Sequence, residues 1–101
     1  MKTIEFGSRF KKSFKKVRSY QKFKLDKYNE VIDCLVNNKP LPAVYDDHKA
    51  APHSPKELKD KRILHLSPNI CMIYATDANS VYLYDIGSHQ DTGLTEDYIS
   101  M

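Results

Sequence analysis

Residues 62–86 read RILHLSPNICMIYATDANSVYLYDI, and this stretch decides the fold. It holds three apolar runs, separated by two short segments of Ser, Pro, Asn and Asp. The runs are residues 62–66, 70–74 and 81–86. Runs of this length between turn-forming residues predict three consecutive strands in a meander. The second run is almost wholly apolar, which predicts a strand in the middle of the sheet.

Two amphipathic helices are predicted upstream of the meander. The first covers about residues 9–20, with Ser8 as its N-cap and apolar residues at spacings of four and three. The second covers about residues 22–36, and its inward stripe includes Leu25. Residues 3–6 alternate and predict a short strand before both helices. The order β-α-α-β-β-β indicates an α+β fold of two layers, in which a two-helix hairpin packs on a small, mostly antiparallel sheet.

The length of 101 residues fits one domain, which we assign to residues 1–90. The acidic tail 91–101 is expected to be disordered, and residues 40–61 are predicted to form a long loop. No apolar run approaches the ~20 residues that span a bilayer, and the N-terminus lacks the apolar segment of a signal peptide. The two cysteines, Cys34 and Cys71, are too few for a disulfide framework and are expected to be buried thiols. A cytoplasmic protein without contact to a membrane is the expectation.

The net charge of +3 hides an asymmetry along the chain. Residues 1–28 carry ten basic and two acidic side chains, a net charge of +8. Residues 29–101 carry six basic and eleven acidic side chains, a net charge of −5. So basic a segment favours an anionic partner, either a nucleic acid or an acidic protein, although a solvated helix face is the ordinary alternative.

All four histidines lie in the second half of the chain. They are His48 and His53 in the long loop, His65 near the end of the first meander strand, and His89 just after the third. The first and third strands of a meander run in the same direction, so His65 and His89 are expected to meet at one edge with His48 above them. Imidazoles with a pKa of about 6.5 suit general acid–base chemistry, although a strand histidine is often only a packing residue.

Other side chains offer weaker candidates. Asp46 and Asp47 precede His48, and Asp85 precedes His89, so each carboxylate is a candidate for orienting an imidazole. No HxxxH or CxxC spacing supports a metal site, so no metal is expected. No phosphate-binding loop, dinucleotide motif or nucleophile elbow is present in the sequence, and no small-molecule cofactor is expected.

Three segments together resemble the YafQ-type toxins of the RelE/ParE superfamily. They are LPAVYDDH at residues 41–48, HLSP at 65–68 leading into Ile73 and Tyr74, and GSH at 87–89. The likeness covers about residues 1–90, including the predicted order of elements and the basic first half.

The resemblance implies a toxin of a type II toxin–antitoxin module. Such a toxin is a ribosome-dependent endoribonuclease that cuts mRNA, inhibits translation, needs no metal and is neutralised by a cognate antitoxin. Its functional histidines match His48, His65 and His89, with His48 and His89 as the proton-transfer pair and His65 on the phosphate. A basic position of the family matches Arg62, which is also expected on the phosphate.

The resemblance also gives the basic helix a use, in binding ribosomal RNA phosphates or an acidic antitoxin segment. The residues expected there are Lys11, Lys12, Lys15, Lys16 and Arg18.

The sequence departs from the family pattern at several positions. Asn69 and Ile70 stand where the family has Asp and an aromatic or apolar residue, so Asn69 is expected to hydrogen-bond a base or phosphate rather than act as a carboxylate base. The Gly-Trp-Lys segment and the final Phe of the family are also absent. Reduced activity or altered codon preference is one implication. The alternatives are a non-catalytic protein on the same scaffold with another target such as gyrase, and a vestigial RNA-binding module.

Overall fold

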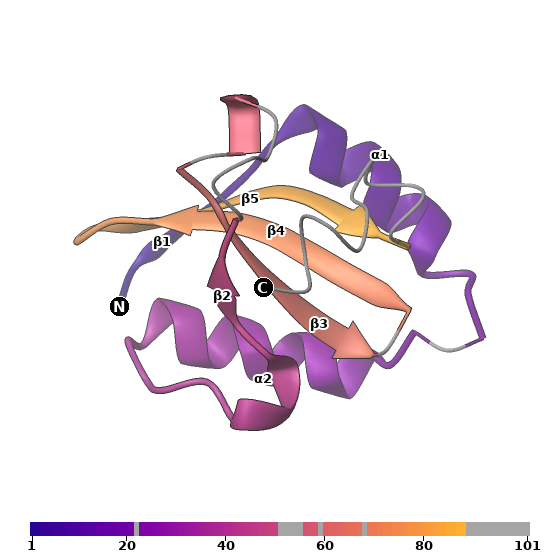
Figure 1. Cartoon of the computed structure of the whole chain (residues 1–101), viewed down its shortest axis with the longest axis horizontal. Coiled ribbons are helices and arrows are strands. Elements are labelled where there is room, and N and C mark those ends of the chain that lie inside the picture. Colours follow the sequence, from indigo (N-terminus) through magenta and orange to yellow (C-terminus); the bar gives the residue numbers. More distant parts are fainter. Residues whose placement is uncertain (22, 51–55, 59, 68, 89–101) are drawn as a thin grey trace.

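The computed structural model describes residues 1–21, 23–50, 56–58, 60–67 and 69–88 (Figure 1). These residues form a five-stranded sheet in the order β1-β5-β4-β3-β2. The strands are β1 (Thr3–Phe6), β2 (His48–Lys49), β3 (Arg62–Ser67), β4 (Ile70–Thr76) and β5 (Ser80–Gly87). The meander is confirmed, and β4 lies in the middle of the sheet as its apolar run predicts.

The sheet is mixed. β2, β3, β4 and β5 pair antiparallel with their neighbours, and β1 pairs parallel with β5 at one edge. A parallel neighbour requires a crossover connection, and here the two helices provide it between β1 and the meander. The predicted fold class, a helix pair on a mostly antiparallel sheet, is therefore confirmed.

The two helices are α1 (Ser8–Val17) and α2 (Leu25–Val36). They contact each other through aromatic rings, because the Phe14 ring of α1 lies 5.0 Å from the Tyr28 ring of α2. The Phe14 ring also lies 5.8 Å, edge-on, from that of Phe23, which precedes α2. α1 packs mainly on β5 (Figure 1). None of the helices in the described ranges is long and apolar enough to cross a membrane.

The two faces of the sheet differ. One face meets the helices in the main core, where Phe10 and Val31 pack on residues such as Met72 and Leu83. The other face carries a smaller cluster of Leu58, Ile63, Cys71 and Ile73. Both cysteines are free and buried, as expected.

Gly7 allows α1 to begin close against β5. A Cβ at this position would lie 2.6 Å from the Tyr82 hydroxyl oxygen and 3.1 Å from the Leu83 carbonyl oxygen. The Gly7 N–H donates to that same carbonyl at 2.9 Å, so a side chain would disrupt the hydrogen bond that holds the junction of β1 and α1 against β5.

Several sequence expectations are wrong in detail. α1 begins at Ser8 itself, and its N-cap is Gly7 without a side-chain cap. α2 begins at Leu25 rather than near residue 22, and Leu25 is 55% exposed rather than inward. The predicted loop 40–61 contains 3-10 turns at Ala43–Tyr45 and Lys56–Leu58 as well as β2. The predicted tail 91–101 lies outside the described residues.

Candidate active site

Two candidate histidines lie on the sheet face opposite the helices. His48 of β2 is the register partner of Ile63, and His65 of β3 is the partner of Cys71. Register partners point to the same side of a sheet, and Ile63 and Cys71 belong to the smaller cluster. We call this side, which carries His48, Ile63, His65 and Cys71, the histidine face.

The two imidazole rings are close and nearly parallel. Their centroids lie 6.1 Å apart and the ring planes differ by 24°. The sequence predicts that both histidines lie at one site, and in the structure their rings are neighbours. His89, the third candidate, and His53 lie outside the described residues.

Hydrogen bonding fixes the tautomer of His48. Its Nδ1 lies 2.8 Å from the backbone carbonyl oxygen of Asp46. A carbonyl only accepts, so Nδ1 carries the proton and Nε2 of the neutral ring keeps its lone pair. Nε2 is shielded from solvent and has no hydrogen-bond partner among the described residues. Buried polar atoms without a partner are rare in proteins, and the lone pair of such a nitrogen can accept a proton.

Asp46 contacts both rings. Its carbonyl holds His48, and its carboxylate Oδ2 lies 3.8 Å from Nδ1 of His65. The residue adopts the left-handed conformation at φ 48°, ψ 50°, which Asp tolerates better than most side chains. Of the two candidate carboxylates that precede His48, Asp46 is therefore the one that lies near both rings.

Asp47 has a different partner, Arg62. Nη2 of Arg62 lies 2.9 Å from Oδ2 of Asp47, and Nε lies 3.2 Å from both carboxylate oxygens. The Tyr74 hydroxyl donates to the same carboxylate at 2.5 Å. The hydrogen bond to Asp47 raises the pKa of the Arg62 guanidinium, although burial acts in the opposite direction.

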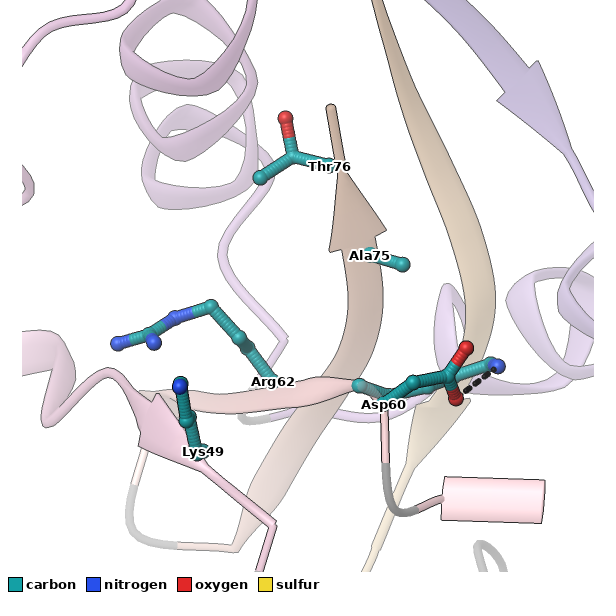
Figure 2. Close-up of a pocket in the computed structure, with 6 residues that line it drawn as sticks. Lys49, Asp60, Arg62, Ala75 and Thr76 are labelled. Atoms are coloured by element: carbon teal, nitrogen blue, oxygen red, sulfur yellow. Dashed lines mark hydrogen bonds and ion pairs between the residues drawn. The ribbon is translucent and has the colours of Figure 1, made fainter. Parts of the chain in front are cut away.

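Arg62 lies on the helix side of the sheet. Its register partner is Tyr74, a residue of the main core, so Arg62 points away from the histidine face. Figure 2 shows its guanidinium beside the end of Lys49 at a surface pocket of about 250 Å³, with Asp60 on the other side of that pocket. Among the described residues, His48 and His65 do not line the pockets that Arg62 lines.

A second basic residue, Arg9 of α1, pairs with a carboxylate next to the histidine face. Asp85 of β5 is the register partner of Ile73 and is fully buried. Nε of Arg9 lies 2.8 Å from Oδ2 of Asp85, and the backbone N–H of Ile86 donates to Oδ1 at 2.9 Å. Burial lowers the pKa of the Arg9 guanidinium, but its hydrogen bond and charge interaction with Asp85 outweigh this and raise that pKa overall. Asp85 is thus paired with a cation, while His89, the imidazole that it was expected to orient, lies outside the described residues.

Arg9 was missed in the sequence because ten cations crowd the first 28 residues. The feature of the sequence that could have predicted a buried ion pair was Asp85. A lone carboxylate within an otherwise apolar strand requires a cationic partner, since an unpaired buried charge is too costly.

The helix cations lie apart from this face. Lys11, Lys12, Lys15, Lys16 and Arg18 are all exposed on α1, in the helical layer. Asn69 is exposed in the turn between β3 and β4, just past the strand that carries His65. The α1 cations therefore form a surface of their own, separate from the two histidines.

A family comparison identifies the scaffold. The family described as "Bacterial toxin of type II toxin-antitoxin system, YafQ" matches residues 2–93. The chain belongs to this YafQ toxin family. The resemblance in the three sequence segments is therefore confirmed, and so is membership of a type II toxin group.

Solved structures of YafQ toxins share this fold. YafQ from E. coli strain BL21(DE3) is 26% identical with a TM-score of 0.76, and the match covers 91% of this chain and 98% of that one. The E. coli DinJ–YafQ complex contains a chain that is 28% identical with a TM-score of 0.73, covering 89% and 96%. A metal-bound toxin from Helicobacter pylori is 31% identical with a TM-score of 0.75, covering 90% and 98%. No curated protein matches the chain.

In this YafQ-family chain, no group of three or more His, Cys, Asp or Glu side chains within the described ranges is arranged to hold a metal ion. His48, His65 and the Asp46 carboxylate are all groups that can exchange protons.

Proposed function

We propose that this toxin is a ribosome-dependent endoribonuclease that cleaves mRNA by attack of a ribose 2′-hydroxyl on the adjacent phosphorus. The observation that carries the proposal is the lone pair of His48 Nε2, shielded from solvent and unpartnered among the described residues. A 2′-hydroxyl would supply the missing partner and lose its proton to this nitrogen. Family membership supports the same reading.

The reaction balances with protein groups alone. His48 accepts the 2′-hydroxyl proton, the 2′-oxygen bonds to phosphorus, and the bond from phosphorus to the 5′-oxygen breaks. His89, which the resemblance makes the partner acid, donates a proton to that leaving oxygen. The products are a 2′,3′-cyclic phosphate and a 5′-hydroxyl.

Charge on the phosphate needs a cation or a hydrogen-bond donor nearby. We assign this role to His65 on the histidine face, with Arg9 on a neighbouring phosphate and Asn69 on a base or phosphate beyond the strand. We leave Arg62 out of the reacting centre, because Asp47 binds its guanidinium on the other side of the sheet.

The partners follow from the same proposal. Exposed cations on α1 would bind ribosomal RNA, placing the toxin in the cytoplasm with its mRNA substrate. The relative in the DinJ–YafQ complex is bound to another protein, which supports a cognate antitoxin for this chain too. A short reading frame abutting this one would support that partner.

The test is induced expression followed by primer extension on cellular mRNA. Wild type is expected to cut within codons, in frame, and His48→Ala and His89→Ala are expected to lose those cuts. His53→Ala, a histidine with no assigned role, is the matched control and should cut normally. Unchanged cutting by His48→Ala would overturn its role as base. Absence of both cutting and growth arrest in wild type would favour a non-catalytic protein with another target.

A further inference from the structure

The strand that carries His48 is short and lies at the edge of the sheet. β2 consists of His48 and Lys49, and its neighbour in the sheet is β3. Just past the strand, the backbone N–H of Ala50 donates to the carbonyl oxygen of Lys61 at 3.1 Å. A strand of this length has few backbone hydrogen bonds, so contacts made by neighbouring side chains matter for where His48 lies.

Asp47, directly before His48, is held by two side chains of the sheet. Arg62 donates to its carboxylate from both Nε and Nη2, and the Tyr74 hydroxyl donates to Oδ1. The Asp47 side chain is 21% exposed, and Tyr74 is buried in the main core. Charge-assisted hydrogen bonds in such a partly buried place are stronger than an exposed ion pair. The carboxylate of Asp47 is therefore fixed relative to β3 and β4.

Tyr45 fixes the chain on the other side of Asp46. Its ring is 2% exposed in the main core, and its hydroxyl donates to the Glu30 carboxylate of α2. Burial, together with this hydrogen bond, raises the pKa of Tyr45 to about 12, so the hydroxyl stays a donor at neutral pH. The Asp46 carbonyl that binds Nδ1 of His48 thus lies between two anchored residues, Tyr45 and Asp47.

The anchor of Asp47 and the imidazole of His48 lie on opposite sides of the sheet. Neighbouring residues of an extended segment point to opposite faces. Arg62 binds Asp47 on the helix side, whereas His48 shares the histidine face with its register partner Ile63. A displacement of Asp47 would move both of its neighbours in the contact, the Asp46 carbonyl and the His48 ring, without bringing Arg62 to the histidine face.

We propose that Arg62 and Tyr74 are positioning residues for His48. By holding the Asp47 carboxylate, they keep the Asp46 carbonyl on Nδ1 of His48. The neutral ring then stays in one tautomer, with the lone pair of Nε2 on the histidine face. Arg62, expected from the sequence on the phosphate, acts instead through Asp47. The consequence for mRNA cleavage rests on the proposed function, but the effect on the His48 tautomer does not.

The first experiment measures the tautomer of His48 by NMR of the full chain with ¹⁵N-labelled histidine. At about pH 8, where an ordinary imidazole is neutral, wild type should show a protonated Nδ1 and an unprotonated Nε2. Arg62→Gln and Tyr74→Phe should move the two nitrogen shifts toward each other, because both tautomers become populated. Tyr74→Phe keeps the aromatic ring in the core, so this variant tests the proposal even if Arg62→Gln folds poorly.

Two variants serve as matched controls for the NMR measurement. Lys39→Gln makes the same charge change and breaks the exposed ion pair of Lys39 with Asp33 on α2. Tyr28→Phe removes a hydroxyl from the same core as Tyr74→Phe does. Neither residue contacts Asp47 in the interactions described above, so both variants should leave the His48 shifts as in wild type.

The second experiment separates positioning from a direct contact with RNA. On ribosomes carrying a defined mRNA, Arg62→Gln should lower the cleavage rate at saturating toxin by about 10- to 100-fold, since a small misplacement of a reacting group has an effect of this size. Ribosome affinity, measured by cosedimentation, should change by less than about twofold, because Arg62 does not bind RNA in this proposal. In the Asp47→Ala background, Arg62→Gln should cause no further loss, because its partner is already gone.

Unchanged His48 shifts in both Arg62→Gln and Tyr74→Phe would overturn the proposal, and so would equal changes in the Lys39→Gln control. A fall in ribosome affinity, with losses that multiply in the double variant with Asp47→Ala, would place Arg62 on RNA instead. Absence of cleavage by wild type would count against the proposed function alone, since the NMR measurement decides the positioning role without it.

Discussion

Asp46 shows where residue-level reasoning from the sequence ends. The sequence identified His48 and His65 as candidates, and their rings do lie together. It did not reveal that the carbonyl of Asp46 fixes the His48 tautomer, because a backbone acceptor looks the same in every residue. The Asp47–Arg62 pair was missed for a related reason. Alternation along β3 separates Arg62 from His65, three residues later, onto opposite faces of the sheet.

Substitutions at Asp46 separate its backbone role from its carboxylate. Asp46→Gly keeps the left-handed conformation easily and should be at least as stable as wild type. In Asp46→Ala, the Cβ is strained by the left-handed backbone conformation and no polar side chain compensates for this strain. The variant should therefore lose about 1 kcal/mol of unfolding free energy. Thermal and urea unfolding measure the stabilities, and mRNA cleavage measures the effect on His48. Equal stability of the Ala and Gly variants would refute a backbone constraint at this position.

The buried carboxylate of Asp85 makes Arg9 important for stability. Arg9→Met leaves an unpaired charge in the sheet and should cost about 3 kcal/mol, the low end for breaking a buried pair, because Arg9 itself is half exposed. Arg9→Met combined with Asp85→Asn should recover much of the loss, since no charge then remains. Urea unfolding at neutral pH is the measurement, with Lys12→Met as the control on the same helix. A loss no larger than that of Lys12→Met would mean that Asp85 does not depend on Arg9.

At the scale of elements, long periodic segments were predictable and short ones were not. The three meander strands and both helices follow from apolar period, and their order follows from the turns between them. β2 has two residues, too few to show any period, so it stayed hidden within the predicted loop. Leu25 fits the inward stripe of α2 by spacing alone, but it is the first residue of the helix and is exposed beside Phe6.

The hairpin between β4 and β5 depends on one carboxylate. Oδ1 of Asp77 accepts the backbone N–H groups of Asn79 and Ser80, each at 2.8 Å. These hydrogen bonds lower the pKa of Asp77 below its ordinary value of 3.8. A lowered pKa in the folded state means that the stabilisation is complete above pH 3.8 and is lost as the pH falls through the folded-state pKa.

Asp77→Ala should therefore lower the melting temperature at neutral pH. The difference from wild type should shrink as the pH falls below about 3.8, because wild type then loses the same hydrogen bonds by protonation. Thermal unfolding across pH 2 to 7 measures this, and Glu5→Ala removes an exposed carboxylate from β1 as the control. A difference that stays constant with pH would show that the turn does not rely on the ionised side chain.

At the scale of the whole molecule, the split of charge along the sequence becomes a split in space. The basic first segment supplies the edge strand β1, all of α1 and the start of α2. His48 and His65 lie on the sheet face opposite the helices. Exposed cations that bind RNA phosphates release counterions, so affinity falls steeply as salt rises. Association of this chain with ribosomes should thus drop sharply between about 50 and 200 mM salt.

The slope of log affinity against log salt measures how many phosphate contacts the chain makes. Lys12→Ala with Lys16→Ala should flatten the plot of log affinity against log salt by about 0.7 to 0.9 for each phosphate contact removed. Lys39→Ala with Lys56→Ala removes the same charge away from α1 and should leave the slope unchanged. Ribosome cosedimentation at several salt concentrations measures both pairs. If the two double variants flatten the slope equally, overall charge rather than the surface of α1 governs docking.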